Sequence, residues 1–111
     1  METNRFQYIE EIKRRLSIMS PARIVLFGSY AQETADADSD IDLIVVLDKE
    51  TTPGGFREKM ADTIAVRKLL ADLNRRVALD VLVYSKKEWQ DFVDSRSSFC
   101  REVLAKGITL Q

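Results

Sequence analysis

The stretch RIVLFGSYAQETADADSDIDLIVVL, residues 23–47, contains two apolar runs separated by a polar segment rich in aspartate. The runs Arg23–Phe27 and Ile41–Leu47 are short and rich in β-branched residues, which is typical of buried strands. Gly28 breaks the first run. Farther along the chain, Val77–Tyr84 has the same apolar and β-branched character. These segments predict a sheet of three or four strands.

Helices are predicted around these strands, because apolar residues recur there every three or four positions. They cover about residues 4–19, a long segment from Phe56 to Leu73, a short segment that begins with a capping box at Ser85 and Glu88, and Ser97–Lys106. Gly107 is expected to close the last helix as a C′ glycine, before a final short strand. The chain is therefore predicted to be one α/β (α+β) domain, residues 1–111, with a small mixed sheet of three to four strands flanked by helices.

The composition argues against several classes of protein. With 17 Lys+Arg against 18 Asp+Glu the net charge is −1, which disfavours binding to nucleic acid by bulk electrostatic attraction. Histidine is absent, so His-ligated zinc and a Ser-His-Asp triad are excluded. Cys100 is the only cysteine, so no intrachain disulfide can form. No apolar stretch is long enough to span a bilayer and no signal peptide is evident, so we expect a cytoplasmic location.

Two aspartates, Asp40 and Asp42, lie at the start of the second predicted strand. Side chains two residues apart on a strand point to the same face, about 7 Å apart at a rise of ~3.3 Å per residue. Such carboxylates raise each other's pKa unless a cation binds between them, and their oxygens suit Mg²⁺ or Mn²⁺. Asp80 lies among apolar residues of the third strand, so we expect it to be buried. It would complete a three-carboxylate site if the third strand neighbours the second.

The acidic segment also has simpler explanations. Asp36, Asp38, Asp40 and Asp42 alternate like the start of an EF-hand calcium loop, but the glycine and glutamate that this loop requires at its sixth and twelfth positions are absent. Asp36 and Asp38 fit a solvated acidic turn, and we assign them no role. Taken alone, Asp40 and Asp42 fit such a turn about as well as a functional site, and Asp80 alone fits a strand-end or ion-paired aspartate.

Gly28 and Ser29 follow the first strand and open a short segment that we expect to be helical. A structural role is sufficient for each residue taken singly, with Gly28 as a turn glycine and Ser29 as a helix N-cap. The same geometry also suits phosphate binding. A small residue lets backbone N–H groups approach a phosphate at a helix N-terminus, and a serine hydroxyl adds a further donor.

These residues combine into one pattern, since Gly28-Ser29, ten further residues and Asp40-x-Asp42 read G-S-x10-D-x-D. The pattern resembles the signature of the DNA polymerase β-like nucleotidyltransferase superfamily. The segment LFGSYAQETADADSDIDLIVV, residues 26–46, is similar to the minimal nucleotidyltransferases, small prokaryotic proteins often found as MntA-type antitoxins beside HEPN-domain toxins. The order of helices and strands agrees over nearly the whole chain, so the resemblance implies the polymerase β-like nucleotidyltransferase fold.

The resemblance implies an enzyme that transfers a nucleoside monophosphate, AMP from ATP or from another NTP, to a hydroxyl of a protein partner. Asp40 and Asp42 would hold two Mg²⁺ ions, or Mn²⁺ in their place, and Asp80 would ligate one of them and help to activate the hydroxyl. Gly28 and Ser29 would bind the triphosphate. The implied partner is a HEPN-domain toxin, with one of its tyrosines as the acceptor.

One departure from the family pattern keeps other functions open. The family commonly reads Gly-Ser-Arg-Ala-Arg-Gly where residues 28–33 of this chain read Gly-Ser-Tyr-Ala-Gln-Glu, so two phosphate-binding arginines are replaced. The alternatives are a non-catalytic antitoxin that acts by complex formation and a nucleotide sensor that binds without transfer. A homo-oligomer is also open. Trp89, Phe92 and Phe99 are either core residues, which we favour, or a surface for a partner.

Overall fold

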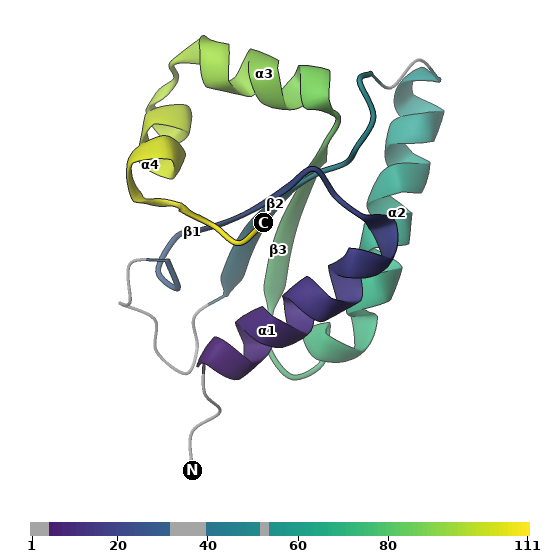
Figure 1. Cartoon of the computed structure of the whole chain (residues 1–111), viewed down its shortest axis with the longest axis vertical. Helices are drawn as coiled ribbons and strands as arrows, with labels where there is room; N and C mark the ends of the chain where they lie inside the picture. Colours follow the sequence, from purple (N-terminus) through teal and green to yellow (C-terminus); the bar gives the residue numbers. More distant parts are fainter. Residues whose placement is uncertain (1–4, 32–39, 52–53) are drawn as a thin grey trace.

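The structure is a computed structural model that describes residues 5–31, 40–51 and 54–111 (Figure 1). Its elements, in chain order, are α1 (Arg5–Leu16), the 3₁₀ helix η1 (Ser17–Met19), β1 (Arg23–Phe27), β2 (Ile41–Val46), α2 (Gly55–Asn74), β3 (Leu79–Tyr84), α3 (Lys86–Ser95), α4 (Ser98–Lys106) and β4 (Ile108–Thr109). The predicted α+β class, with a small mixed sheet flanked by helices, is confirmed. Within the described part of the chain, no helix is both long and apolar enough to cross a membrane.

The sheet has four strands in the order β3-β2-β1-β4. β1 pairs antiparallel with β2 and with β4, whereas β2 and β3 run parallel. Parallel strands need a long crossover connection, which α2 provides between β2 and β3. β2 is therefore an inner strand with buried residues along nearly its whole length, and β3 forms one edge of the sheet.

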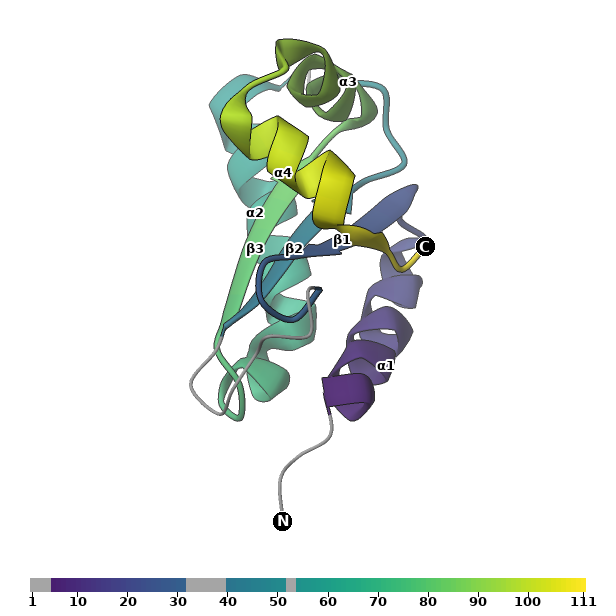
Figure 2. The same ribbon diagram turned by 90° about the vertical axis from the view of Figure 1, so that its left-hand side faces the viewer.

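Helices cover both faces of the sheet (Figures 1 and 2). One face, which includes Ile24 and Leu43, forms the larger apolar cluster together with residues of α1 and α2. The opposite face, which includes Val25 and Ile44, packs against α3 and α4. Side chains alternate between the faces along each strand, so Asp42 shares the α3/α4 face with Ile44.

Two predicted boundaries differ from the structure by more than one residue. The first helix ends as an α-helix at Leu16 and continues as the tighter η1 before Pro21. Asn4, which the sequence offers as an N-cap for this helix with Gln7 three residues on, lies outside the described residues. The third strand begins at Leu79 and not at Val77. Apolar character continues into the turn before β3, so composition alone places the start of the strand too early.

Gly107 ends the last helix, but not as the left-handed C′ glycine that we predicted. Its φ is −71°, and its N–H donates a hydrogen bond to the Val103 carbonyl at 2.7 Å. A Cβ at this position would lie 2.4 Å from the same carbonyl oxygen. Glycine is needed here because the chain turns from α4 into β4 with its backbone packed against the last helical turn.

The predicted capping box at the start of α3 is confirmed and leads to a stability prediction. The Ser85 hydroxyl accepts a hydrogen bond from the Glu88 N–H at 3.2 Å, and the Glu88 carboxylate accepts one from the Ser85 N–H at 2.9 Å. Ser85→Ala is expected to lower the free energy of unfolding by about 1 kcal/mol, because it removes a cap at a buried position. Chemical denaturation measures this loss, and Ser98→Ala, an exposed serine at the start of α4, should cost much less. Equal losses for the two variants would contradict this account of the cap.

The aromatic residues of α3 and α4 mainly contribute to the core, as we favoured. Trp89 and Phe92 pack against the smaller apolar cluster, with ring centroids 5.5 Å apart. Phe99 lies edge-on to Phe92 and is 42% exposed. Among the aromatic side chains whose burial the structure describes, Phe56 on α2 is the most exposed, at 77%. Burial in the core therefore accounts for Trp89 and Phe92.

Candidate active site

The predicted carboxylates lie at one end of the sheet, on the face that α3 and α4 share. Asp42 is opposite Asp80 in the parallel pair β2–β3 and opposite Phe27 in the antiparallel pair β1–β2. Neighbouring strands are about 4.8 Å apart, so the side chains of Asp42 and Asp80 are direct neighbours. Asp40 lies two residues before Asp42, just ahead of β2. The predicted adjacency of the second and third strands is confirmed, and it brings the three aspartates together.

The electrostatics of Asp42 reflect this crowding. Burial raises the pKa of Asp42 above the ordinary aspartate value, and the nearby carboxylates of Asp80 and Asp40 raise it further. Asp42 is half-buried, whereas Asp40 and Asp80 are exposed. The repulsion between like charges expected from the sequence is therefore centred on Asp42.

Asp80 is exposed, so the prediction of a buried carboxylate was wrong. The apolar neighbours of Asp80 along the chain suggested burial, but β3 is the edge strand and one side of it has no neighbouring strand. The order of strands in the sheet, which the sequence pattern does not contain, decides this exposure. The result is a carboxylate next to Asp42 that solvent and a ligand can reach.

Gly28 lies directly against Asp42. Its φ is +73°, in the left-handed region that glycine adopts most readily. A Cβ on Gly28 would lie 2.2 Å from Asp42 Oδ2 and 3.2 Å from Asp42 Cγ. The backbone conformation therefore favours glycine here, and a Cβ would displace the Asp42 carboxylate from its position.

The segment after Gly28 is a turn where the structure describes it, and not the helix that we predicted. The Ala31 N–H donates a hydrogen bond to the Gly28 carbonyl at 3.1 Å, and Ser29 is half-buried inside this turn. Tyr30 is 7% exposed and packs with the larger apolar cluster. The rest of the segment, with Asp36 and Asp38, lies outside the described residues.

The donor set of the three aspartates suits a hard divalent cation. All the potential ligand atoms are carboxylate oxygens. Burial, and after it the nearby Asp80 and Asp40 carboxylates, raise the pKa of Asp42, and a bound cation would offset this penalty on its charge. Among the described residues, no three acidic or cysteine side chains are already gathered tightly enough to hold one ion. The exposed Asp40 and Asp80 carboxylates would therefore have to turn towards a shared centre beside Asp42.

A change at Asp42 should reveal this repulsion as a pH-dependent stability. A raised pKa means that folding favours protonated Asp42, so the penalty for its charge is absent below the ordinary value of 3.8 and develops as the pH rises through the raised pKa. Asp42→Asn is therefore expected to raise Tm by about 2–5 °C at neutral pH without metal, and not below that value. Thermal unfolding in EDTA at both pH values measures the difference.

Asp91→Asn provides the matched control for this prediction. It makes the same chemical change at an aspartate that pairs with Lys87 at 2.8 Å, so it should leave Tm unchanged or slightly lower it. If Asp42→Asn gave no stabilisation at neutral pH relative to this control, the repulsion centred on Asp42 would be contradicted.

A cavity of about 510 Å³ lies between α2 and the edge strand β3, and Asp80 is one of its lining residues. Its lining includes Arg67 and Arg75 from α2 together with Asp80. No local pattern in the sequence marks these arginines as part of a site, because charged residues on a predicted helix usually form its solvated face. The sequence contains one indication for Arg75, which lies five residues before Asp80 and close to the start of the third strand.

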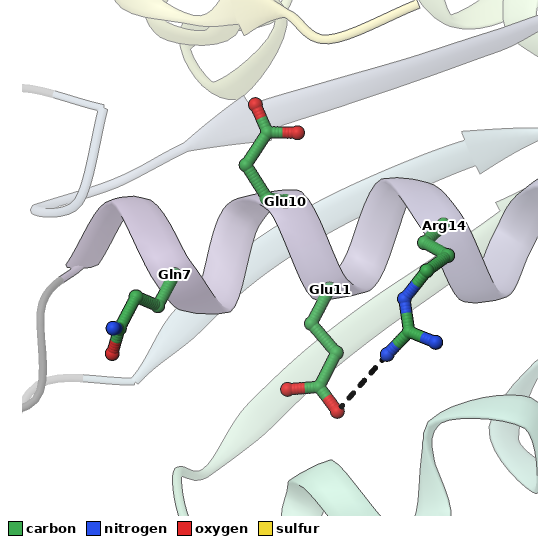
Figure 3. A pocket seen from close by; sticks show the side chains of 4 residues that line it. All are labelled: Gln7, Glu10, Glu11 and Arg14. Atoms are coloured by element: carbon green, nitrogen blue, oxygen red, sulfur yellow. Dashed lines mark ion pairs between the residues drawn. The ribbon is translucent and has the colours of Figure 1, made fainter.

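A second hollow, of about 530 Å³, lies on the outside of α1 (Figure 3). Gln7, Glu10, Glu11 and Arg14 line it. Glu11 pairs with Arg15 at 2.9 Å and with Arg76 at 3.0 Å, and the Arg15 guanidinium holds the pKa of Glu11 below its ordinary value. The charge of Glu11 in this hollow is thus largely compensated. Since none of the three aspartates lines the hollow either, it is not the candidate site.

Residues 7–104 match the family model described as a nucleotidyltransferase domain. The chain is also similar to a solved structure described as a toxin-antitoxin with AMP-PNP, with 26% identity and a TM-score of 0.56. That match covers 93% of this chain and 72% of the other. A search among curated proteins finds no match.

Two further similar structures are mutants of the toxin-antitoxin MntA-HpeT. One has 24% identity and a TM-score of 0.53, over 98% of this chain and 73% of the other. The second has 26% identity and a TM-score of 0.52, over 99% of this chain and 73% of the other. The likeness at 24% identity supports the fold alone. The family match spans β1, β2 and β3 and includes Gly28, Asp42 and Asp80.

Proposed function

The chain belongs to the nucleotidyltransferase domain family, as a minimal member similar to MntA, and we propose that it transfers a nucleoside monophosphate from an NTP, most simply AMP from ATP, to a hydroxyl of a protein partner. The observation that carries this proposal is the position of Asp42, whose carboxylate lies against Gly28 on one side and beside Asp80 on the other. A toxin-antitoxin structure with AMP-PNP among its relatives supports the choice of nucleotide.

The proposed partner is a toxin, because the similar structures are toxin-antitoxin complexes. In this proposal the chain is the antitoxin, the toxin is a HEPN-domain protein, and the pair acts in the cytoplasm. The whole chain, residues 1–111, serves as one nucleotidyltransferase domain. The acceptor is then supplied by the partner protein.

Each site residue has a chemical role in the proposed reaction. Asp40, Asp42 and Asp80 would hold two Mg²⁺ ions, or Mn²⁺, and when bound these ions supply positive charge that stabilises the attacking and leaving oxygens. Gly28 leaves room for phosphate oxygens beside Asp42, and Ser29 with the N–H groups of its turn would orient the triphosphate. The exposed Asp80 carboxylate would accept the proton of the attacking hydroxyl.

The proposal is tested by incubating the protein with ATP, Mg²⁺ and the HEPN-domain toxin proposed as its partner. We expect the intact mass of the partner to increase by one or more nucleoside monophosphates. EDTA should prevent the increase, because the three aspartates alone leave the phosphate charges without compensation. An unmodified partner with every NTP, while a complex of the two proteins forms, would rule out the transferase function.

A non-catalytic antitoxin is the second candidate, and one observation favours it. Tyr30 is buried in the apolar core at a position where the family commonly carries an arginine that can bind phosphate. In this case complex formation alone would neutralise the toxin. A double variant, Asp40→Asn with Asp42→Asn, that still fully protected cells from the toxin would support this candidate over the enzyme.

A further inference from the structure

The cavity beside Asp80 lies between the C-terminal half of α2 and the edge strand β3. It has a volume of about 510 Å³. Leu70 and Val81 give it a buried apolar floor, and Arg67, Arg75 and Asp80 lie at its exposed rim. Asp80, whose side chain lies on the α3/α4 face beside Asp42, borders the cavity at the edge of the sheet. The cavity therefore combines an apolar base and two cations next to one of the site aspartates.

The two arginines of this cavity are available to a ligand. Both are exposed, and neither forms an ion pair with any residue in 5–31, 40–51 or 54–111. Some other basic side chains near α2 are occupied in the fold, such as Lys59, which pairs with Glu88 at 2.9 Å, and Arg76, which pairs with Glu11 at 3.0 Å. Two unpaired guanidinium groups at the rim of an apolar cavity favour a ligand with an anionic group and an apolar part.

The edge of β3 offers backbone hydrogen bonds inside the same cavity. The carbonyls of Ala78 and Tyr84 accept hydrogen bonds from Ile41 and Leu47 at the two ends of β2. Because backbone groups alternate in direction along a strand of a parallel pair, those of Leu79, Val81 and Val83 point away from β2. At the ends of this outer edge, the Leu79 N–H donates to Asn74 Oδ1 at 2.9 Å, and the Val83 carbonyl accepts from the Lys59 ammonium. Val81 lies between them, and its outward groups have no hydrogen-bond partner among the described residues. An extended peptide can pair with such an edge.

The order of the strands places this cavity and the proposed phosphate-binding residue Gly28 on opposite sides of Asp42. Asp42 on β2 has β1 and Gly28 on one side and β3 with Asp80 on the other. In an in-line displacement at phosphorus, the leaving group and the attacking oxygen lie on opposite sides. If the triphosphate binds at Gly28, the attacking hydroxyl has to arrive from the side of Asp80, where the cavity opens.

We propose that this cavity binds the acceptor, which is an extended protein segment with an acidic side chain next to the hydroxyl residue. This inference rests on the proposed function. The segment's backbone pairs with Val81, its acidic side chain binds Arg67 and Arg75, and its hydroxyl lies beside Asp80. A segment with basic neighbours is disfavoured, because its charge repels both guanidinium groups.

The reaction in this arrangement is balanced without a further reactant. The hydroxyl oxygen forms a bond to the α-phosphorus of the NTP, and the bond from the α-phosphorus to the oxygen that bridges it to the β-phosphorus breaks. Pyrophosphate leaves on the side of Gly28. The hydroxyl proton passes to the Asp80 carboxylate and from there to water.

The test compares two labelled peptides in the absence of nucleotide and metal. One has the sequence Leu-Glu-Tyr-Glu-Val, and in the other both glutamates are replaced by lysine. We expect fluorescence anisotropy to show about tenfold tighter binding of the acidic peptide to the native protein at low salt. Equal binding of both peptides would overturn the proposal.

Charge reversal at the rim provides the matched variant. Arg67→Glu with Arg75→Glu is expected to lose the preference or to invert it in favour of the lysine peptide. The single variant Arg67→Glu leaves Arg75, at the end of α2, unchanged. It should lose most of the preference for the acidic peptide. Arg57→Ala with Arg101→Ala removes two exposed, unpaired positive charges outside the cavity and should keep the tenfold preference. A preference that survives charge reversal at the rim, or disappears in the control, would contradict the site.

The failure of this inference can be distinguished from the failure of the proposed function. Peptide preference is measured without ATP, whereas transfer is measured as a mass increase of the partner. If the double variant Arg67→Glu with Arg75→Glu modified the partner at the native rate, the acceptor site would be overturned and the transferase function would stand. Peptide preference that depends on both arginines would support the site even if no transfer occurred.

Discussion

Replacing Asp42 by asparagine is expected to reduce the rate of nucleotide transfer on the order of 10³-fold. Asp42 is the central carboxylate of the three, beside Asp80 across the parallel strand pair and against Gly28 at the end of β1. The variant keeps the shape of the side chain but removes the charge that would hold the cations. A time course of partner modification at saturating ATP and Mg²⁺ measures the rate.

The same substitution at a remote position controls for this effect. Asp91→Asn, on the exposed side of α3, should retain the native rate, because Asp91 pairs only with Lys87 on its own helix. Asp42→Asn is also expected to be at least as stable as the native chain, so lost activity could not be attributed to unfolding. A rate within tenfold of the native rate for Asp42→Asn would contradict the role of Asp42.

Replacing Gly28 by alanine is expected to reduce transfer about 10²-fold and to lower the free energy of unfolding by about 1–2 kcal/mol. The stability loss follows from a φ of +73°, which disfavours residues with a Cβ. The rate loss follows from the 2.2 Å approach of the new Cβ to Asp42 Oδ2, which would force the carboxylate to turn away. Chemical denaturation and the rate of partner modification measure the two losses separately.

Gly55 provides a matched control for Gly28. Its φ is +65°, so alanine there meets a similar backbone penalty, but no described atom lies within 4 Å of the new Cβ. Gly55→Ala should therefore lose similar stability and keep the native rate. If both alanine variants retained full activity, the contact between Gly28 and Asp42 would have no part in the reaction.

The sheet could be predicted in large part because its strands have strong local signals. Arg23–Phe27 and Ile41–Val46 form β1 and β2 as their apolar and β-branched residues indicate, and Ser85 with Glu88 starts α3 as the capping box indicates. The resemblance to minimal nucleotidyltransferases is confirmed by the family match and by the similar structures. These features depend on residues close together in the sequence.

The features that could not be predicted depend on the order of the strands in space. Asp80 was expected to be buried, but β3 forms the edge of the sheet and leaves it exposed. The same edge position opens the cavity with Arg67 and Arg75, which belong to a helix that only the parallel crossover brings next to Asp80. Gly107 serves a close backbone contact in place of a left-handed cap, which its position in the sequence cannot reveal.

The central claim is that the chain transfers a nucleoside monophosphate, and the position of a radioactive phosphorus in ATP tests it most directly. The protein, Mg²⁺ and the proposed HEPN-domain partner are incubated with ATP labelled at either the α- or the γ-phosphorus. We predict that the partner becomes labelled only from α-labelled ATP, and that Asp42→Asn prevents this labelling. Labelling from the γ position, or no labelling from either position by a protein that binds its partner, would contradict the account.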